Sequence, residues 1–567
     1  MRCRVSSTSI RSAIVRPFAP KTEGPFVPEQ PPVQPPPPRA STLAIPVGRE
    51  VRPSSLGERI ARVSPLSLAV VQWTSCGIIV AILLFPSLLA SLMAIPGFPQ
   101  SGGAIMRIRM WQRGFGFNPY GADPLLPPQT AFLLLLLALA IVGAFAAQAI
   151  AFWRAWNGSE RHPAWQWWAG PIGSHLILLF MAPMSADVFF YAMTGDMAAN
   201  GHNPYLHPLR EFPENPLYRY NHWLDMTSVY GPLWTSVSRV VVSITGPDPV
   251  RVVIAYKLLL GLSALALAGL VWLIALRLTE SRRLATCAFV LVAWQPNMIL
   301  ETSGQGHNDS FMLLLLVAGI GTLLVFGARF LRPALVIAAL SVGVKYVTLP
   351  VVGLVALARI ATVRHGHGAG RRLAWAWALD ALVLVAIAAI FIAPYWTGPE
   401  FFREMVREPG RLFSNPVFQP RLRSLMREMG LGSTLRMLQH GLPVIMQSLV
   451  VLFLLREAGR NALTMLDLGR LATSPRSPRP ARRTGALPLE ITVALLQSWM
   501  AVTIALSMCT PNAHSWYLTW PVVPVALYVV VQRRRGTEGY GSAAMPHWFW
   551  AYLAITGLMT VASFQVS

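Results

Sequence analysis

The chain has 567 residues, of which 54% are hydrophobic and only 13% are charged, and its formal net charge is +23. Soluble domains carry about 25% charged residues, so this composition excludes a soluble fold for most of the chain and predicts helices in lipid. The positive charge does not indicate nucleic-acid binding, because the arginines concentrate in tails and in loops that alternate with apolar runs, as in the cytoplasmic loops of membrane proteins.

The first 62 residues are rich in arginine, serine and proline and include the prolines at positions 31–32 and 35–38. Such a segment cannot bury enough apolar surface to fold. We therefore expect residues 1–62 to form a disordered, basic cytoplasmic tail, and residues 63–567 to form one transmembrane domain.

Apolar runs alternate with polar loops along the rest of the chain, and about 20 apolar residues cross the hydrocarbon core as a helix. The runs are residues 66–92, 130–153, 167–184, 250–276, 284–300, 311–326, 373–392, 444–455, 487–508, 516–531 and 548–561. With two shorter runs described next, they predict an all-α polytopic membrane protein of about 13 spans with a cytoplasmic N-terminus.

Three other apolar runs are short for a span. Residues 333–343 and 347–357 flank Lys345, which predicts a broken helical hairpin with the lysine at its extracytoplasmic tip. Residues 233–244 predict a re-entrant or juxtamembrane helix. The arginine-rich segment 403–436 falls on the same extracytoplasmic side and opposes the usual distribution of positive charge.

When successive loops are assigned to alternate sides of the membrane, an unusual set of polar and aromatic residues falls on the extracytoplasmic face. Aromatic rings stack on sugars, and carboxylates, amides and imidazoles bind hydroxyls, whereas a membrane-interface belt is the simpler explanation for each Trp or Tyr alone. The candidate binding residues are Asp187, Tyr191, Asn203, Tyr205, His222, Tyr230, Trp234, His307, Asn308, Asp309, Lys345 and His514. The same segments contain Glu301, Gln305, Trp516 and Tyr517.

Nothing in the sequence predicts a metal or a nucleotide cofactor. There is no Asp-x-Asp pair, no Walker loop and no Gly-x-Gly-x-x-Gly sequence that opens a helix. The four cysteines show no spacing typical of a metal site or a disulfide framework.

Several of these residues stand in an order that resembles a known family. The sequence SADVFFYAMTGD is followed by GHNPY, then YGPLW, then GHND and an intramembrane lysine. This order is similar to that of the GT-C glycosyltransferases that use polyprenyl-phosphate sugars, and most of all to the polyprenol-phosphomannose-dependent α-1,6-mannosyltransferases of actinobacterial cell envelopes. The resemblance covers residues 167–350; beyond them it consists mainly of alternating spans.

The resemblance implies a GT-C-like bundle in the bacterial plasma membrane, with an extracytoplasmic active site. It implies transfer of a mannosyl residue from a polyprenyl phosphate to a hydroxyl of a membrane-anchored glycan. A single displacement would invert the anomeric centre. A metal is dispensable if cations neutralise the donor phosphate, so we expect no cofactor besides the lipid-linked donor.

Physical arguments assign roles within this reaction. One carboxylate must accept the acceptor proton, and Asp187 occupies the position of the family's acidic residue; the alternative is a carboxylate that only marks a helix end. Asp309 is the second carboxylate or a helix N-cap. The donor phosphate has Lys345, His307 and either Arg251 or Lys257 as candidate partners. Lys345 could instead snorkel to lipid phosphates.

Two other functions are compatible with the sequence. A transporter or flippase for a lipid-linked glycan would place polar residues along the spans and show internal pseudo-symmetry. A non-catalytic relative would keep the fold without the reaction. Transfer of sugar from a polyprenyl-phosphate donor would separate the enzyme from both.

Overall fold

The computed structural model describes a subset of the chain: residues 63–85, 127–158, 162–362, 369–402, 428–430, 448–449, 452–464, 466–467, 487–509 and 515–537. The expected tail, most of the arginine-rich segment and the run 548–561 lie outside these residues. The expected boundary between tail and domain therefore stays a prediction.

The expected all-α polytopic architecture is confirmed. The part of the chain that the structure describes is built from helices without β-strands, and six of the helices are long and apolar enough to cross a membrane. These are α2 (Pro65–Leu84), α5 (Pro127–Asn157), α9 (Pro249–Thr279), α12 (Asp309–Phe326), α16 (Ala369–Ile392) and α20 (Leu489–Cys509).

A seventh span is bent. The predicted run 284–300 folds as α10 (Arg282–Ala293) followed by α11 (Pro296–Ile299) and a π-helical turn (Leu300–Gly304), with a bend of 52°. Pro296 explains the break, because proline has no backbone N–H and clashes with the preceding turn. The π-turn matters below, since π-turns inside helices are frequent at functional sites.

The other apolar runs among the described residues form helices that are shorter than the six spans. They are α6 (Ala164–Leu178), α8 (Pro232–Thr245), α13 (Leu331–Val342), α14 (Leu349–Leu357) and α21 (Val522–Thr537). The described residues contain six or seven spans. Of the 13 expected, the run 548–561 and half of the run 444–455 lie outside the described residues, and α6 and α21 are shorter than their predicted runs. Two predictions about short segments are confirmed: α13 and α14 are separate halves around Lys345, and residues 233–244 form the short helix α8.

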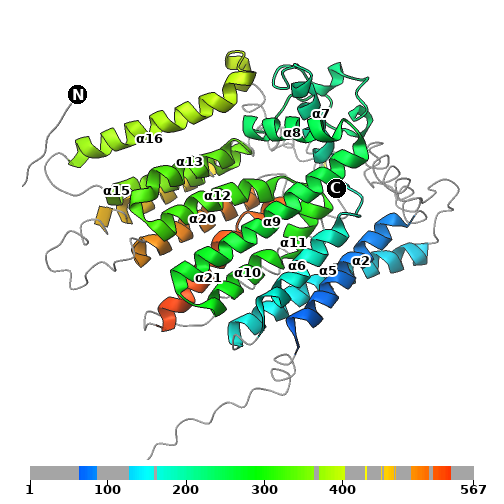
Figure 1. Ribbon diagram of the computed structural model, residues 1–567, viewed down its shortest axis with the longest axis horizontal. Helices are drawn as coiled ribbons and strands as arrows, with labels where there is room; N and C mark the ends of the chain where they lie inside the picture. Colours follow the sequence, from blue (N-terminus) through cyan, green and yellow to red (C-terminus); the bar gives the residue numbers. More distant parts are fainter. Residues whose placement is uncertain are drawn as a thin grey trace, which may run out of the picture. The chain divides into compact units, whose positions relative to one another are not determined.

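Helix α9 lies at the centre of the bundle, packed against α10, α12 and α21 (Figure 1). The pair α12 and α13 is especially close, because a Cβ on Gly319 would lie 2.5 Å from the backbone nitrogen of Ala338. Small residues at such contacts let helix backbones approach where lipid provides no hydrophobic driving force.

Helices α7 (Asp187–Ala199) and α8 pack together at one end of the bundle and both contact α9 (Figure 1). Gly195 permits this packing, since a Cβ there would lie 2.5 Å from the carbonyl carbon of Ser238. Almost the whole of α7 is buried. A segment that the sequence analysis assigned to an extracytoplasmic loop thus becomes a rigid helix that begins at Asp187.

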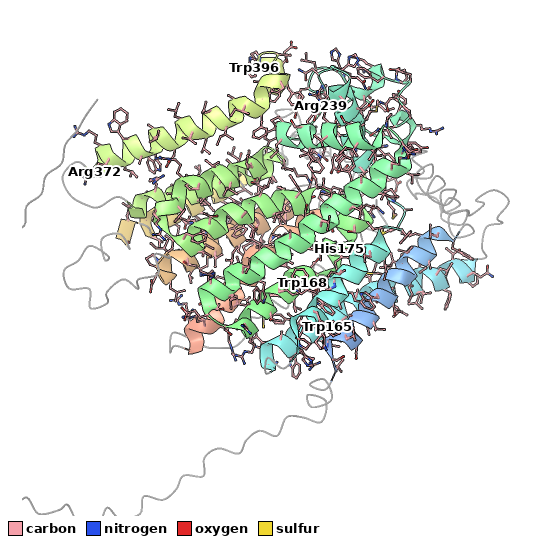
Figure 2. The ribbon with its side chains drawn as sticks, viewed as in Figure 1. Trp165, Trp168, His175, Arg239, Arg372 and Trp396 are labelled. Atoms are coloured by element: carbon pink, nitrogen blue, oxygen red, sulfur yellow. The ribbon has the colours of Figure 1, made fainter. Side chains whose placement is uncertain are left out.

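Helix α16 is tied to the bundle by a buried carboxylate. Asp380 lies midway along α16 and is 4% exposed. Arg359 donates to it through Nε and Nη2 at 2.8 and 2.7 Å, and Arg332 donates through Nε at 2.9 Å. Figure 2 labels Arg372 and Trp396 near the two ends of this helix.

These ion pairs predict a ranking of stability. Asp380→Leu should destabilise by about 3–5 kcal/mol, because it removes the carboxylate with which the largely buried Arg359 pairs. Arg359→Gln should cost more than Arg332→Gln, because the Arg359 side chain is 13% exposed and that of Arg332 is 42% exposed. Thermal unfolding in detergent would measure this, and equal losses for the two arginine variants would contradict the ranking.

Candidate active site

The loop that leads into α7 is held at a fixed position by Gln305. Its side-chain oxygen accepts hydrogen bonds from the backbone N–H groups of Met184 and Ser185, at 2.8 and 3.2 Å. Gln305 follows the π-turn of the bent span, so two segments about 120 residues apart in sequence are joined here. Asp187, the first residue of α7, follows two residues after Ser185.

Asp187 is a buried carboxylate, 8% exposed, that receives two phenol hydrogen bonds. Tyr230 Oη donates to Oδ2 at 2.9 Å, and Tyr191 Oη donates to the same oxygen at 3.3 Å. Burial and the charge of Asp187 raise the pKa of both phenols well above the usual value. Both tyrosines therefore remain protonated donors and stabilise the ionised carboxylate.

His307 lies between two carboxylates. Its Nδ1 donates to Glu301 Oε2 at 2.8 Å, while its Nε2 lies 3.8 Å from Asp187 Oδ2. The ring packs on Trp516, with 4.1 Å between ring centroids. Burial alone lowers the pKa of His307, but the hydrogen bond to Glu301 and the neighbouring carboxylate charges raise it above its ordinary value.

Local backbone geometry presents His307 to Asp187. Glu301 is in the π-turn, and its carbonyl accepts from the His307 N–H at 2.8 Å. Gly306 has a φ of +83°, and a Cβ there would lie 2.3 Å from Val188 Cγ2. Only glycine combines this left-handed conformation with such close contact to α7. This requirement explains the glycine in the sequence GHND.

Asp309 forms the second half of the site. Lys345 Nζ donates to Asp309 Oδ2 at 2.8 Å, and Trp520 Nε1 donates to Oδ1 at 2.7 Å. Lys345 Nζ also lies 5.8 Å from the ring centroid of Tyr230, the residue that binds Asp187. Asp309 is the first residue of α12, and Asn308 occupies the N-cap position.

The structure thus gathers six of the candidate residues into one group. We call these six residues and Glu301 the carboxylate cluster. The six are Asp187, Tyr191, Tyr230, His307, Asp309 and Lys345. They come from α7, the segment before α8, the end of the bent span, the start of α12 and the break between α13 and α14.

Three other candidates lie around this cluster and support it. Tyr205 Oη donates to the Tyr230 carbonyl at 2.9 Å, and Asn203 Nδ2 donates to the Tyr395 carbonyl at 2.8 Å. Trp234 is buried with its ring against Tyr191, at 5.2 Å between centroids. Tyr205 and Trp234 thus contact the two tyrosines of the cluster, whereas Asn203 joins its loop to the segment at Tyr395.

The last three candidates differ in their surroundings. Asn308 is fully buried, and neither polar atom of its side chain has a hydrogen-bond partner among the described residues. His222 is exposed and packs beside Trp223. His514 lies outside the described residues.

The four side chains predicted as possible partners of the donor phosphate lie in different surroundings. Lys345 and His307 belong to the carboxylate cluster. Lys257 is fully buried in α9, where its ammonium donates to the carbonyls of Leu178 and Met181 at the end of α6. Arg251 is exposed in the first turn of α9.

Glu301, Gln305 and Trp516 stand in the predicted polar segments without a predicted role, and Trp520 is not among the predicted residues. Glu301 and Gln305 lie within the segment that ends in GHND, and this position in the sequence is what indicates that they belong to the site. Trp520 is about 210 residues from its partner Asp309, and a tryptophan at a helix boundary has no distinctive sequence context. Among the residues that the structure describes, no cluster of three or more His, Cys, Asp or Glu is placed to hold a metal ion.

Known proteins are similar in sequence to the part of the chain that contains most of the cluster. Residues 99–361 match the family described as alpha-(1->6)-mannopyranosyltransferase, N-terminal domain. The chain is 32% identical over 197 residues to alpha-(1->6)-mannopyranosyltransferase A of Corynebacterium glutamicum, and 30% identical over 160 residues to alpha-(1->6)-mannopyranosyltransferase B of that organism. The expected resemblance to the α-1,6-mannosyltransferase family is confirmed.

The two alignments cover 34% and 27% of this chain, and 38% and 25% of the respective mannosyltransferases. No solved structure matches the chain. The part that matches the mannosyltransferase family contains Asp187, Tyr230, His307 and Lys345, whereas Trp516 and Trp520 come from beyond it.

The raised pKa of His307 predicts a pH-dependent stability. The histidine–glutamate ion pair contributes fully below the ordinary imidazole pKa of about 6.5, and its contribution is lost as the pH rises through the raised value in the folded protein. The difference in melting temperature between wild type and His307→Gln should therefore shrink above about pH 6.5.

Thermal unfolding over a pH series would test this, with His222→Gln as the control because that histidine is exposed. A difference between wild type and His307→Gln that stays constant with pH would show that no protonated imidazole is involved.

Proposed function

We propose that this protein is a membrane glycosyltransferase that moves a mannosyl residue from a polyprenyl phosphate to a hydroxyl of a membrane-anchored glycan. The observation that carries the proposal is the contact of Tyr230 with both ends of the carboxylate cluster. Its hydroxyl binds Asp187 and its ring lies beside Lys345. A basic group and a phosphate-binding cation are thereby close enough to act on one substrate.

In the proposed reaction, the acceptor oxygen attacks the anomeric carbon and Asp187 takes the hydroxyl proton. The bond between the anomeric carbon and the donor phosphate oxygen breaks, and its electron pair leaves with the polyprenyl phosphate. A phosphate leaves readily, so one base suffices and a general acid is not needed. Displacement in one step inverts the anomeric configuration.

Lys345 provides the charge that the leaving phosphate requires. Its side chain is 13% exposed, and its ammonium carries three N–H donors, of which Asp309 accepts one. Asp309 and Trp520 hold the lysine in place, and the break between α13 and α14 brings it to the cluster. In this role, no metal is required to neutralise the donor.

We assign the cluster to the extracytoplasmic face of a bacterial plasma membrane. Arginines gather in the loops and helix ends on the other side of the spans from Asp187, as at Arg282 and Arg283 and at the end of α21. Positive charge favours the cytoplasmic side. The acceptor would then be a glycan anchored in the outer leaflet.

The assignment of Asp187 as base predicts how turnover changes when an amide replaces its carboxylate. Asp187→Asn keeps the shape and the acceptor oxygen for Tyr230 but cannot accept a proton at neutral pH. It should bind donor and lose turnover by about 10²–10⁴-fold. Mannosyl transfer from polyprenyl phosphomannose by the reconstituted protein would measure this, with Asp196→Asn, a partly buried carboxylate elsewhere on α7, as the matched control.

Near wild-type turnover by Asp187→Asn would assign the base elsewhere. Loss of donor binding in the same variant would indicate a positioning role instead of proton transfer.

The assignment of Lys345 predicts a change in donor affinity. Removing the lysine alone would leave Asp309 buried without its ion pair, so the informative variant is the double substitution Lys345→Met with Asp309→Asn. It should raise the donor KM about 10- to 100-fold, the value of a hydrogen bond to a charged group. Lys345→Arg keeps the charge and should lose less, and an unchanged KM in the double variant would remove Lys345 from the donor site.

A further inference from the structure

Three aromatic side chains from the segment before α21 lie against the carboxylate cluster. They are Trp516 and Tyr517, in the short helix η8 (Ser515–Thr519), and Trp520, which follows it. We call them the η8 aromatic group. The ring of Trp516 packs on His307 with 4.1 Å between centroids, and the indole of Trp520 donates to Asp309 at 2.7 Å. The group thus contacts both halves of the cluster.

The short helix holds these rings in fixed positions. The Ser507 hydroxyl of α20 donates to the Tyr517 carbonyl at 2.7 Å, and the Thr519 hydroxyl donates to the Trp516 carbonyl at 2.6 Å. The Tyr517 ring contacts both indoles, with its centroid 4.5 Å from that of Trp520 and 5.6 Å from that of Trp516. Trp520 is buried, whereas Trp516 is only half-buried, so part of Trp516 is accessible to a substrate.

The proposed reaction separates the two ends of the cluster. In a single displacement, the acceptor oxygen and the departing phosphate lie on opposite sides of the anomeric carbon. The phosphate belongs beside Lys345, and the acceptor hydroxyl belongs beside Asp187. Trp516 lies at the Asp187 end, because its ring packs on His307, whose Nε2 is 3.8 Å from Asp187 Oδ2. A ring in this position meets the acceptor sugar and not the lipid phosphate.

We infer that Trp516 is the residue on which the sugar ring of the acceptor stacks, and that it selects acceptors that end in a hexopyranose. This inference rests on the proposed function. One face of a pyranose is lined by C–H groups, which pack on the negative face of an aromatic ring. A linear polyol offers no such face. Trp516 lies beyond residues 99–361, so acceptor recognition comes from a part of the chain that the family match does not cover, whereas Asp187 lies inside it.

The test removes the aromatic face and keeps an apolar side chain. Trp516→Leu should raise the KM for octyl α-mannopyranoside as acceptor about tenfold, as expected for loss of one aromatic contact, and should leave the KM for polyprenyl phosphomannose largely unchanged. Trp516→Phe keeps a smaller ring and should raise the acceptor KM about threefold. Trp223→Leu is the matched control and should change neither KM, because that tryptophan is partly exposed and packs beside His222, which lies outside the cluster.

A ring that only positioned His307 would give a different result. Its loss would change kcat and the pH dependence of kcat, and it would leave the acceptor KM unaltered. Melting temperatures identify a misfolded variant, and Trp516→Phe decides the question if the leucine variant does not fold. An unaltered acceptor KM, or a rise in both KM values by the same factor, would overturn the inference.

A binding measurement keeps the inference separate from the proposed function. An octyl mannoside that carries a diazirine on its sugar, in phosphatidylcholine vesicles with the full-length protein, should label the peptide that contains Trp516. Methyl α-mannopyranoside should compete, whereas mannitol, a polyol without a ring, should not. Equal competition by mannitol, or labelling that Trp516→Leu leaves unchanged, would overturn the inference even if mannosyl transfer occurs. Specific labelling without any transfer would support the sugar site while the proposed function fails.

Discussion

The burial of a carboxylate, Asp187, is the constraint on which this structure depends. Asp187 loses most of its water, and a carboxylate in a region of low dielectric is stable only with donors and cations around it. Tyr191 and Tyr230 supply the donors, and the imidazole of His307, which Glu301 holds in position, lies beside the carboxylate. Each partner requires its own support, which explains why α7, α8, the bent span and the hairpin around Lys345 all meet at this end of the bundle.

For the same reason, several helices end or bend at the site. Regular helices satisfy their own backbone groups and present side chains along their length, but they cannot bring five short polar segments to one point in lipid. The protein ends or bends helices there instead: α6 ends, the bent span passes through a π-turn, and α13 stops before Lys345. Gln305 and Lys257 then satisfy backbone groups that the breaks expose.

Much of the fold and part of the site follow from the sequence. Apolar periodicity and length give the long spans, and the paired short runs give the hairpin around Lys345 because a charge within apolar sequence is informative by itself. The motifs bring Asp187, His307, Asp309 and Lys345 to attention for the same reason. The sequence does not distinguish a spanning run from a bent or short one, because Pro296 and the turn before α21 change geometry without changing hydropathy.

Which side chains of the site contact one another depends on the tertiary structure. Asn203, Tyr205 and Trp234 stand in the same series of motifs as Tyr191 and Tyr230, yet they lie outside the cluster. Tyr205 and Trp234 contact its tyrosines, and Asn203 binds the Tyr395 carbonyl. Trp520 joins Asp309 from about 210 residues away. Side-chain type cannot separate these roles, because a buried tyrosine or tryptophan seeks a hydrogen-bond partner in either position.

Lys257 has a consequence for the biogenesis of the protein. Its ammonium is satisfied by carbonyls at the end of α6, and α6 leaves the ribosome before α9. When α9 enters the membrane, the acceptors for its charged side chain are therefore already present. Without them, the translocation machinery would have to release an uncompensated lysine into lipid. The lysine thus makes the insertion of α9 depend on the earlier insertion of α6.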